Sequence, residues 1–218
     1  MKLALYLYLA LLIIQFIMLF MALSVRKKAG AYYLPMLILV AVHFVLDCVD
    51  SFVPGKPLRW VQVQDLKVFL SLLLIAWQAK QWHVFDQRPL SFKLFLGSCL
   101  AGWVTQQALL ITGVTEFNAF VILACVGIVL LCIEALNRNM IQSRSAFLRN
   151  PIFLFCVAMI FYFMFYGLLE LFTLIPYKFS EYTILSMGYL YITLGILTGI
   201  IYIRAILCIP PKDKYYSY

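Results

Sequence analysis

Residues 3–25 read LALYLYLALLIIQFIMLFMALSV, a run of 23 residues without a charged side chain. An α-helix rises about 1.5 Å per residue, so this run is long enough to cross a hydrocarbon core of about 30 Å. The basic triplet Arg26-Lys27-Lys28 follows it directly. The run is too long for the apolar core of a signal peptide, and we therefore expect it to be retained as a first transmembrane helix.

The composition of the whole chain indicates the same environment. Of its 218 residues, 65% are hydrophobic and 12% are charged, and the mean hydropathy is +0.98. Soluble domains have about 45–50% apolar and about 25% charged residues. So few charges cannot cover the surface of a water-exposed domain of this size. The sequence therefore excludes a soluble fold and predicts that most of the surface faces lipid.

Dividing the chain at its charged residues predicts an all-α bundle of seven transmembrane helices. Besides 3–25, three runs without charge, 94–115, 150–169 and 182–203, are long enough to span. Two more become long enough if Asp47 and Glu134 lie near their ends. We expect a single domain over residues 1–218, with spans at approximately 3–25, 30–50, 60–81, 94–115, 117–136, 150–175 and 182–207.

The third predicted span is the weakest of the seven. Asp65, Lys67 and Lys80 leave it an uncharged stretch of only 12 residues. Trp60 and Trp82 stand at its ends, where an aromatic belt is expected. We expect Lys67 and Lys80 to extend their charged ends toward the membrane surface.

The basic residues predict the orientation. With the N-terminus outside, twelve of the 17 lysines and arginines fall on the cytoplasmic side, and the other five are Lys2, Lys56, Arg59, Lys67 and Lys178. This asymmetry follows the positive-inside rule, so we expect the N-terminus outside and the C-terminus in the cytoplasm. The expected location is a bacterial inner (plasma) membrane, with the lipid bilayer as the main partner.

Polar residues of the predicted spans gather toward the outer face in this orientation. Each is costly in hydrocarbon and tends to face a partner or a water-filled cavity. We therefore predict an outward-facing cavity for a small polar or amphipathic ligand. Its candidate residues are His43, Asp47, Asp50, Gln62, Asp65, Gln106, Gln107, Tyr162, Tyr166 and Glu170. The alternative is that these groups only hydrogen-bond one another and fix the helix positions.

His43 and Asp47 lie four residues apart and so share one helix face. They could supply two metal ligands, with Asp50 or Glu170 completing the site, or a proton acceptor for coupled transport. A hydrogen-bonded structural pair is the interpretation we favour, and we expect no metal and no cofactor. Because Asp47 and Glu170 have matched predicted depths, we also expect Glu170 to share a cavity with this pair, with His43 as the only nearby cation.

Gly188, Gly195 and Gly199 form one stripe of the last predicted span. Close packing between helices of one chain is the favoured interpretation, and a homo-oligomer through this face is the alternative. The net charge of +8 is scattered over short loops, which argues against a nucleic-acid partner.

Several motifs of the last third resemble a known family. Arg149-Asn150-Pro151-Ile152-Phe153 leads into the aromatic run at 161–163, and Leu207-Cys208-Ile209-Pro210-Pro211-Lys212 closes the last span. This combination resembles the small seven-helix modules of Bacteroidetes-type bacteria, which are similar to the membrane sensor part of some histidine kinases. The resemblance implies a ligand-sensing or accessory role with output through a protein partner.

Known catalytic patterns do not support an enzyme. The last predicted span has no lysine for a retinal, and the chain has no Gly-x-Ser-Gly of an intramembrane serine protease. We therefore favour a non-enzymatic membrane sensor or accessory subunit. The alternative is a small-solute or proton-coupled transporter. A third reading is a membrane-embedded enzyme of lipid metabolism that uses Asp47, Asp50 and Glu170.

Overall fold

The computed structural model describes residues 2–52, 57–86, 89–112, 119–142, 147–174 and 180–210. Every regular element in these ranges is helical, which confirms the predicted all-α class. The α-helices are α1 Lys2–Ala29, α2 Leu34–Phe52, α3 Pro57–Gln81, α4 Pro89–Ile111, α5 Ala119–Gln142, α6 Pro151–Leu174 and α7 Glu181–Leu207. Two 3-10 turns, η1 Ala31–Tyr33 and η2 Phe147–Arg149, precede α2 and α6.

Six of these helices are long and apolar enough to cross a membrane, counted over the described ranges: α1, α2, α4, α5, α6 and α7. By length and composition the chain is therefore a multi-pass helical membrane protein. The remaining helix, α3, carries Asp65, Lys67 and Lys80 and is less apolar. Asp65 and Lys67 are nevertheless buried, at 1% and 5% exposure, because neighbouring helices cover them.

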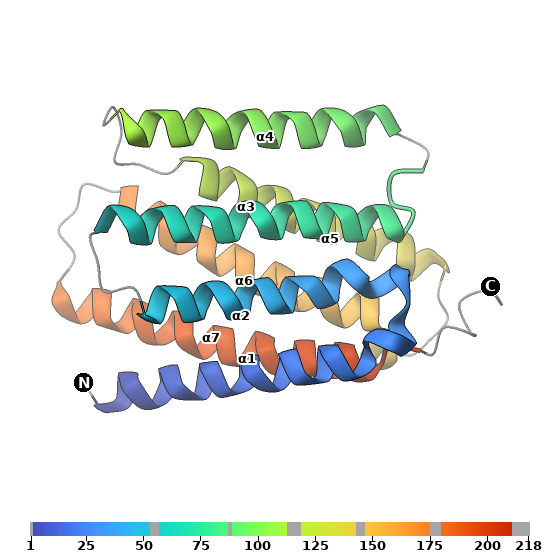
Figure 1. Cartoon of the computed structure of the whole chain (residues 1–218), viewed down its shortest axis with the longest axis horizontal. Helices are drawn as coiled ribbons and strands as arrows, with labels where there is room; N and C mark the ends of the chain where they lie inside the picture. The colour runs from blue at the N-terminus through green and yellow to red at the C-terminus, as the bar shows by residue number, and fades with distance from the viewer. Residues whose placement is uncertain are drawn as a thin grey trace.

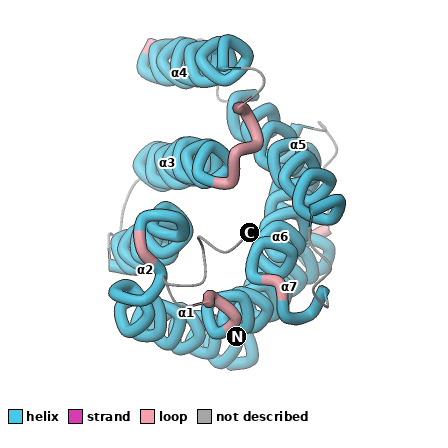
Figure 2. The backbone as a smooth tube through the Cα atoms, turned by 90° about the vertical axis from the view of Figure 1, so that its right-hand side faces the viewer, coloured by secondary structure: helices cyan, strands magenta, loops and turns pink. Residues whose placement is uncertain are grey.

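Six helices form a closed ring in the order α1, α2, α3, α5, α6 and α7, with α7 packed back against α1. Figure 2 looks along the helix axes and shows this ring, with α4 lying outside it against α3 and α5. Successive helices run in opposite directions (Figure 1). We call the end where α1, α3, α5 and α7 begin the N end, and the end where α2, α4 and α6 begin the C end. In Figure 1 they lie at the left and right.

Two helix starts follow from local capping. The Asn150 side-chain oxygen accepts hydrogen bonds from the backbone N–H groups of Ile152 and Phe153, at 2.9 and 3.3 Å. Pro151, which has no N–H to lose, then occupies the first turn of α6, as its position after Asn150 predicts. The Ser180 hydroxyl caps α7 in the same way by accepting from the N–H of Thr183.

Several helix ends differ from the predicted spans, most clearly in α4 and α5. Helix α4 begins at Pro89 rather than at 94, and α5 continues to Gln142 rather than ending near 136. Both differences have one cause, because a charged residue such as Lys93 or Glu134 limits the segment that fits in hydrocarbon but does not end a helix. The sequence also predicts a short turn around Thr112–Glu116, and of this segment residues 113–116 lie outside the described part of the chain.

Aromatic side chains fill the ring near the C end. The ring centroid of Trp82 lies 6.4 Å from that of Tyr33 and 5.4 Å from that of Phe155, and Phe155 lies 5.4 Å from Tyr202. Gln78, which is fully buried, lies in the same region. We call these five residues the C-end closure.

Hydrogen bonds tie the C-end closure to the start of α2. The Gln78 amide nitrogen donates to the Tyr32 carbonyl at 2.7 Å, and its oxygen accepts from the Met36 N–H at 2.9 Å. The Tyr202 hydroxyl donates to the Met36 carbonyl at 2.7 Å. Helices α3 and α7 are thereby attached to the first turn of α2 across the interior of the ring.

The glycine stripe of α7 packs mainly within the chain. A Cβ at Gly195 would lie 3.1 Å from Leu11, and one at Gly199 would lie 2.6 Å from Ile14, so both glycines allow α1 to approach α7 closely. A Cβ at Gly188 would meet nothing within 4 Å. Gly188 is therefore the part of the stripe left for a contact with a second copy, which stays a prediction.

Candidate ligand-binding site

A cavity of about 160 Å³ lies inside the ring, with walls from α1, α2, α3, α6 and α7. Tyr8 of α1 and Gln64 of α3 line it toward the N end. Val40, Met159 and Tyr202 line its other end, where the C-end closure begins. The cavity therefore lies in the part of the ring between the N end and this closure.

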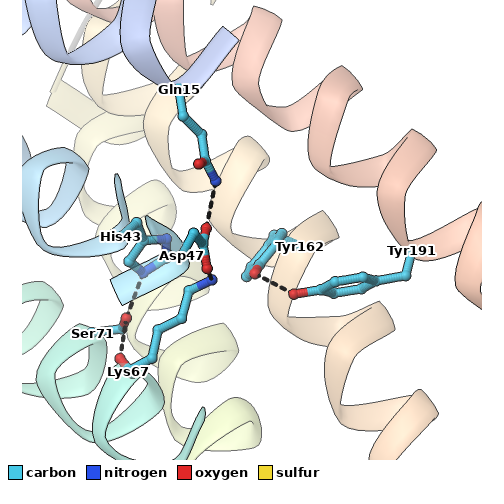
Figure 3. Close-up of polar contacts among 7 residues, drawn as sticks. All are labelled: Gln15, His43, Asp47, Lys67, Ser71, Tyr162 and Tyr191. Carbon is cyan, nitrogen blue, oxygen red and sulfur yellow. Dashed lines mark hydrogen bonds and ion pairs between the residues drawn. The ribbon is translucent and has the colours of Figure 1, made fainter. Parts of the chain in front are cut away.

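A buried ion pair stands at the cavity wall (Figure 3). The Lys67 ammonium lies 2.5 Å from one carboxylate oxygen of Asp47, and their side chains are 6% and 15% exposed. The other Asp47 oxygen accepts a hydrogen bond from the Gln15 amide nitrogen at 2.6 Å. Removing one member of such a pair leaves a buried charge without its partner, so Asp47 and Lys67 depend on each other. The three side chains join α1, α2 and α3.

The neighbours of His43 show that its Nε2 atom carries a proton. The Ser71 hydroxyl donates its single proton to the Lys67 carbonyl at 2.7 Å, as a serine bonded back one helical turn does. The His43 Nε2 atom lies 2.7 Å from the same hydroxyl oxygen, so Nε2 must be the donor of that bond. In the neutral ring this assignment makes Nδ1 an acceptor. His43 lines the cavity together with Asp47.

Two tyrosines form another part of the wall. The hydroxyls of Tyr162 on α6 and Tyr191 on α7 are hydrogen-bonded at 2.8 Å, and both residues line the cavity. The pair holds two hydroxyl protons and uses one of them in its own bond. The Tyr166 ring packs beside both, with centroids 6.3 Å from Tyr162 and 5.8 Å from Tyr191.

The other polar residues form a separate group between α3, α4 and α6. The Gln107 amide donates to one Asp65 oxygen at 3.1 Å, and Glu170 is close enough to Asp65 for the two carboxylates to interact electrostatically. Gln106 is buried on α4. Glu170 is half-buried one helical turn from Tyr166.

Two predictions about this region are wrong. Glu170 does not share the cavity that His43 and Asp47 line. The sequence indicates how deep a residue lies but not which helix lies beside it, and Glu170 is within electrostatic range of Asp65 instead. Lys67 does not extend toward the membrane surface, because its ammonium turns into the ring to meet Asp47. Lys67, and not His43, is thus the cation beside Asp47. The side chains of Asp50 and Gln62 lie outside the described residues.

Of the seven polar residues drawn in Figure 3, four were not among the candidates taken from the sequence: Gln15, Lys67, Ser71 and Tyr191. Gln15 had a signal that could have been used, since it is the only amide or charged side chain in the run 3–25. Lys67 and Ser71 are four residues apart, which places both on one face of α3. Tyr191 stands among many other tyrosines and has no distinguishing pattern.

Metal ligands are not gathered at this site. Across the described ranges, the structure holds no group of three or more His, Cys, Asp and Glu side chains that could bind a metal ion. Asp47, the central candidate, is engaged by Lys67 and Gln15. What the arrangement offers is a small cavity lined by both polar and apolar side chains.

The chain matches no protein-family model, and no curated protein or solved structure is significantly similar to it. The likeness to the seven-helix sensor modules therefore stays a prediction from the sequence.

Proposed function

We propose that the chain spans the membrane seven times, with the N end outside and the C-terminus in the cytoplasm. Helix α3 runs from the N end to the C end between α2 and α5 (Figure 1). The two helices beside it in sequence, α2 and α4, are both apolar enough to cross a membrane. Since α2 ends at the N end and α4 begins at the C end, the chain between them has to cross. A reporter fused after Tyr218 should read cytoplasmic and one inserted at 54–55 external; an even number of crossings would contradict the proposal.

The proposed activity is the binding of a small ligand in the cavity beside Asp47, reached from the outer side, by a non-enzymatic sensor or accessory subunit. One observation carries this proposal: the cavity has a buried polar wall that is only partly satisfied by the protein. Gln15 is 7% exposed, and its amide oxygen has no hydrogen-bond partner among the described residues. A buried acceptor of this kind costs free energy that a bound donor recovers.

The signal of ligand binding would pass to a protein partner through a displacement of helices. The cavity is lined by α1 and α7 near Gly195 and Gly199, where the two helices pack closely. A ligand that wedges between α1 and α7 would shift these helices relative to each other. Helix α7 continues to the C end, so its displacement would reach the cytoplasmic side, where a partner would read it.

A transporter is the second candidate. The observation in its favour is the ion pair of Asp47 and Lys67 with His43 close by, since ionisable groups inside a membrane often lie on ion or proton pathways. The C-end closure argues against a transporter, because Gln78, Trp82 and Tyr202 fill the ring between the cavity and the C end. Alternating access would require this closure to open.

Ligand binding can be tested by thermal unfolding of the purified protein against a library of small amphipathic compounds. A compound that binds the folded state raises the unfolding temperature. The matched control is Val40→Phe, which fills the cavity end at a buried valine. We expect compounds that stabilise the native chain and not Val40→Phe. Uptake of such a compound into proteoliposomes, abolished by Asp47→Asn, would replace the sensor with the transporter. An absence of stabilising compounds would refute both.

A further inference from the structure

We infer that the cavity takes a neutral molecule of about the size of benzene that carries a hydroxyl group, as in phenols and small cyclic alcohols. This inference rests on the proposed function, because it names the ligand class of the same cavity. The size, the charge and the hydrogen-bonding groups of the wall each restrict that class.

The volume sets the size of the ligand. The cavity measures about 160 Å³, and an apolar protein cavity of about 150 Å³ holds one benzene molecule. Much of the wall is apolar, from Leu11, Leu12, Met18, Val40 and Met159. These side chains favour an apolar body of about this size.

The ion pair makes the ligand neutral. Asp47 lines the cavity, and Lys67 neutralises it from behind at 2.5 Å. His43 donates from Nε2, a hydrogen bond that the neutral ring makes without a further charge in the wall. A charged ligand would lose its hydration on entry and meet a wall whose charges already balance, which is unfavourable in a low-dielectric interior.

Hydrogen bonding requires a donor on the ligand. A carboxylate accepts but does not donate, so Asp47 fixes the Gln15 amide with its nitrogen toward Asp47 and its oxygen away. That oxygen is buried and has no partner within the described part of the protein. A ligand N–H or O–H would satisfy it, whereas a hydrocarbon or an ether would not.

The tyrosine pair selects a hydroxyl among the donors. One proton of Tyr162 and Tyr191 remains for a bond outside the pair. A ligand hydroxyl can donate to Gln15 and accept from this tyrosine proton, because its oxygen does both. An ammonium group has protons but no lone pair, so it would satisfy only one of the two.

The test compares para-fluorophenol with fluorobenzene, whose rings are alike but of which only the phenol has a hydroxyl. Fluorine NMR of each probe with the purified full chain measures its affinity, and Val40→Phe gives the background from detergent. We expect the phenol to bind about tenfold more tightly than fluorobenzene, the effect of about one to two hydrogen bonds. In Gln15→Leu the affinity for the phenol should fall about tenfold, while the affinity for fluorobenzene should stay within about twofold of its native value.

The outcomes separate the two proposals. Equal affinities of the two probes for the native chain would overturn the proposal that the ligand carries a hydroxyl. The proposal that the cavity binds a small ligand would still hold. Binding of neither probe above the Val40→Phe background would overturn both. If Gln15→Leu does not fold, the ratio of the two affinities in the native chain decides the question alone. Tighter binding of trimethylphenylammonium or of benzoate than of the phenol would contradict a neutral ligand.

Discussion

Two buried glutamines, one at the cavity and one in the C-end closure, are used differently. Gln78 in the C-end closure uses both ends of its amide, donating to the Tyr32 carbonyl and accepting from the Met36 N–H. Gln15 at the cavity uses only its nitrogen, which donates to Asp47, and no partner of its oxygen lies in the described part of the chain. Both side chains are costly to bury in a membrane protein.

The difference separates a structural polar group from a binding group. A fully bonded amide fixes the helices it joins, and nothing further is gained by adding a ligand. A half-bonded amide beside a cavity keeps part of its bonding capacity for another molecule. A variant of Gln78 in the C-end closure should therefore lose stability alone. A variant of Gln15 at the cavity should lose affinity for the ligand.

The largest effect on the free energy of unfolding is expected for variants of the Asp47–Lys67 ion pair. Lys67→Met would leave Asp47 as a buried charge without its cation, and we expect a loss of about 3–5 kcal/mol in the free energy of unfolding. The double variant Lys67→Met/Asp47→Leu removes both charges and should recover most of this loss. Unfolding in mixed micelles by SDS measures both. A single variant as stable as the native chain would show that the pair does not hold the cavity wall.

The next effect is expected at the C-end closure. Gln78→Leu removes the partner of a buried N–H on α2 and of the Tyr32 carbonyl, and should lower stability by about 2 kcal/mol. The affinity for para-fluorophenol should stay within about twofold of the native value. Gln15→Leu is the matched comparison, since it makes the same substitution at the cavity. A similar loss of phenol binding in both variants would remove the distinction between the two glutamines.

The smallest effect is expected where α1 meets α7 at the cavity wall. A Cβ at Gly199 would come within 2.6 Å of Ile14, so Gly199→Ala should cost about 1–2 kcal/mol by overpacking. Gly188→Ala on the same helix is the control, because a Cβ there meets nothing within 4 Å and should cost nothing. Equal stability of the two variants in SDS unfolding would place the tight contact elsewhere.

Much of the fold could be predicted from the sequence. Charge-free runs identified four of the helices, since hydrocarbon tolerates few charges, and the other three were predicted with charged residues inside them. Asn150 and Pro151 placed the start of α6 correctly, because capping is a local property. The ring order could not be obtained in this way, because it depends on contacts between helices far apart in the sequence. The position of α4 outside the ring is the clearest case.

The site was predicted in part. His43, Asp47 and Tyr162 line the cavity, while Asp65 and Glu170 belong to the separate group between α3, α4 and α6. Lys67 was assigned to the membrane surface because a lysine near a helix end usually extends there. Its actual direction is set by Asp47 on another helix, and a single sequence does not reveal such a pairing.

The central claim is that the cavity is reached from the outer side and closed toward the cytoplasm. It is tested most directly by labelling Gln64→Cys, at a half-buried position where the cavity wall approaches the N end, in a chain whose six native cysteines are replaced by alanine. Vesicles of known and opposite orientation are treated with the small, membrane-impermeant sulfonatoethyl methanethiosulfonate. We predict labelling from the outer side and none from the cytoplasmic side, where Trp82 and Tyr202 close the ring. Labelling from the cytoplasmic side would contradict the claim.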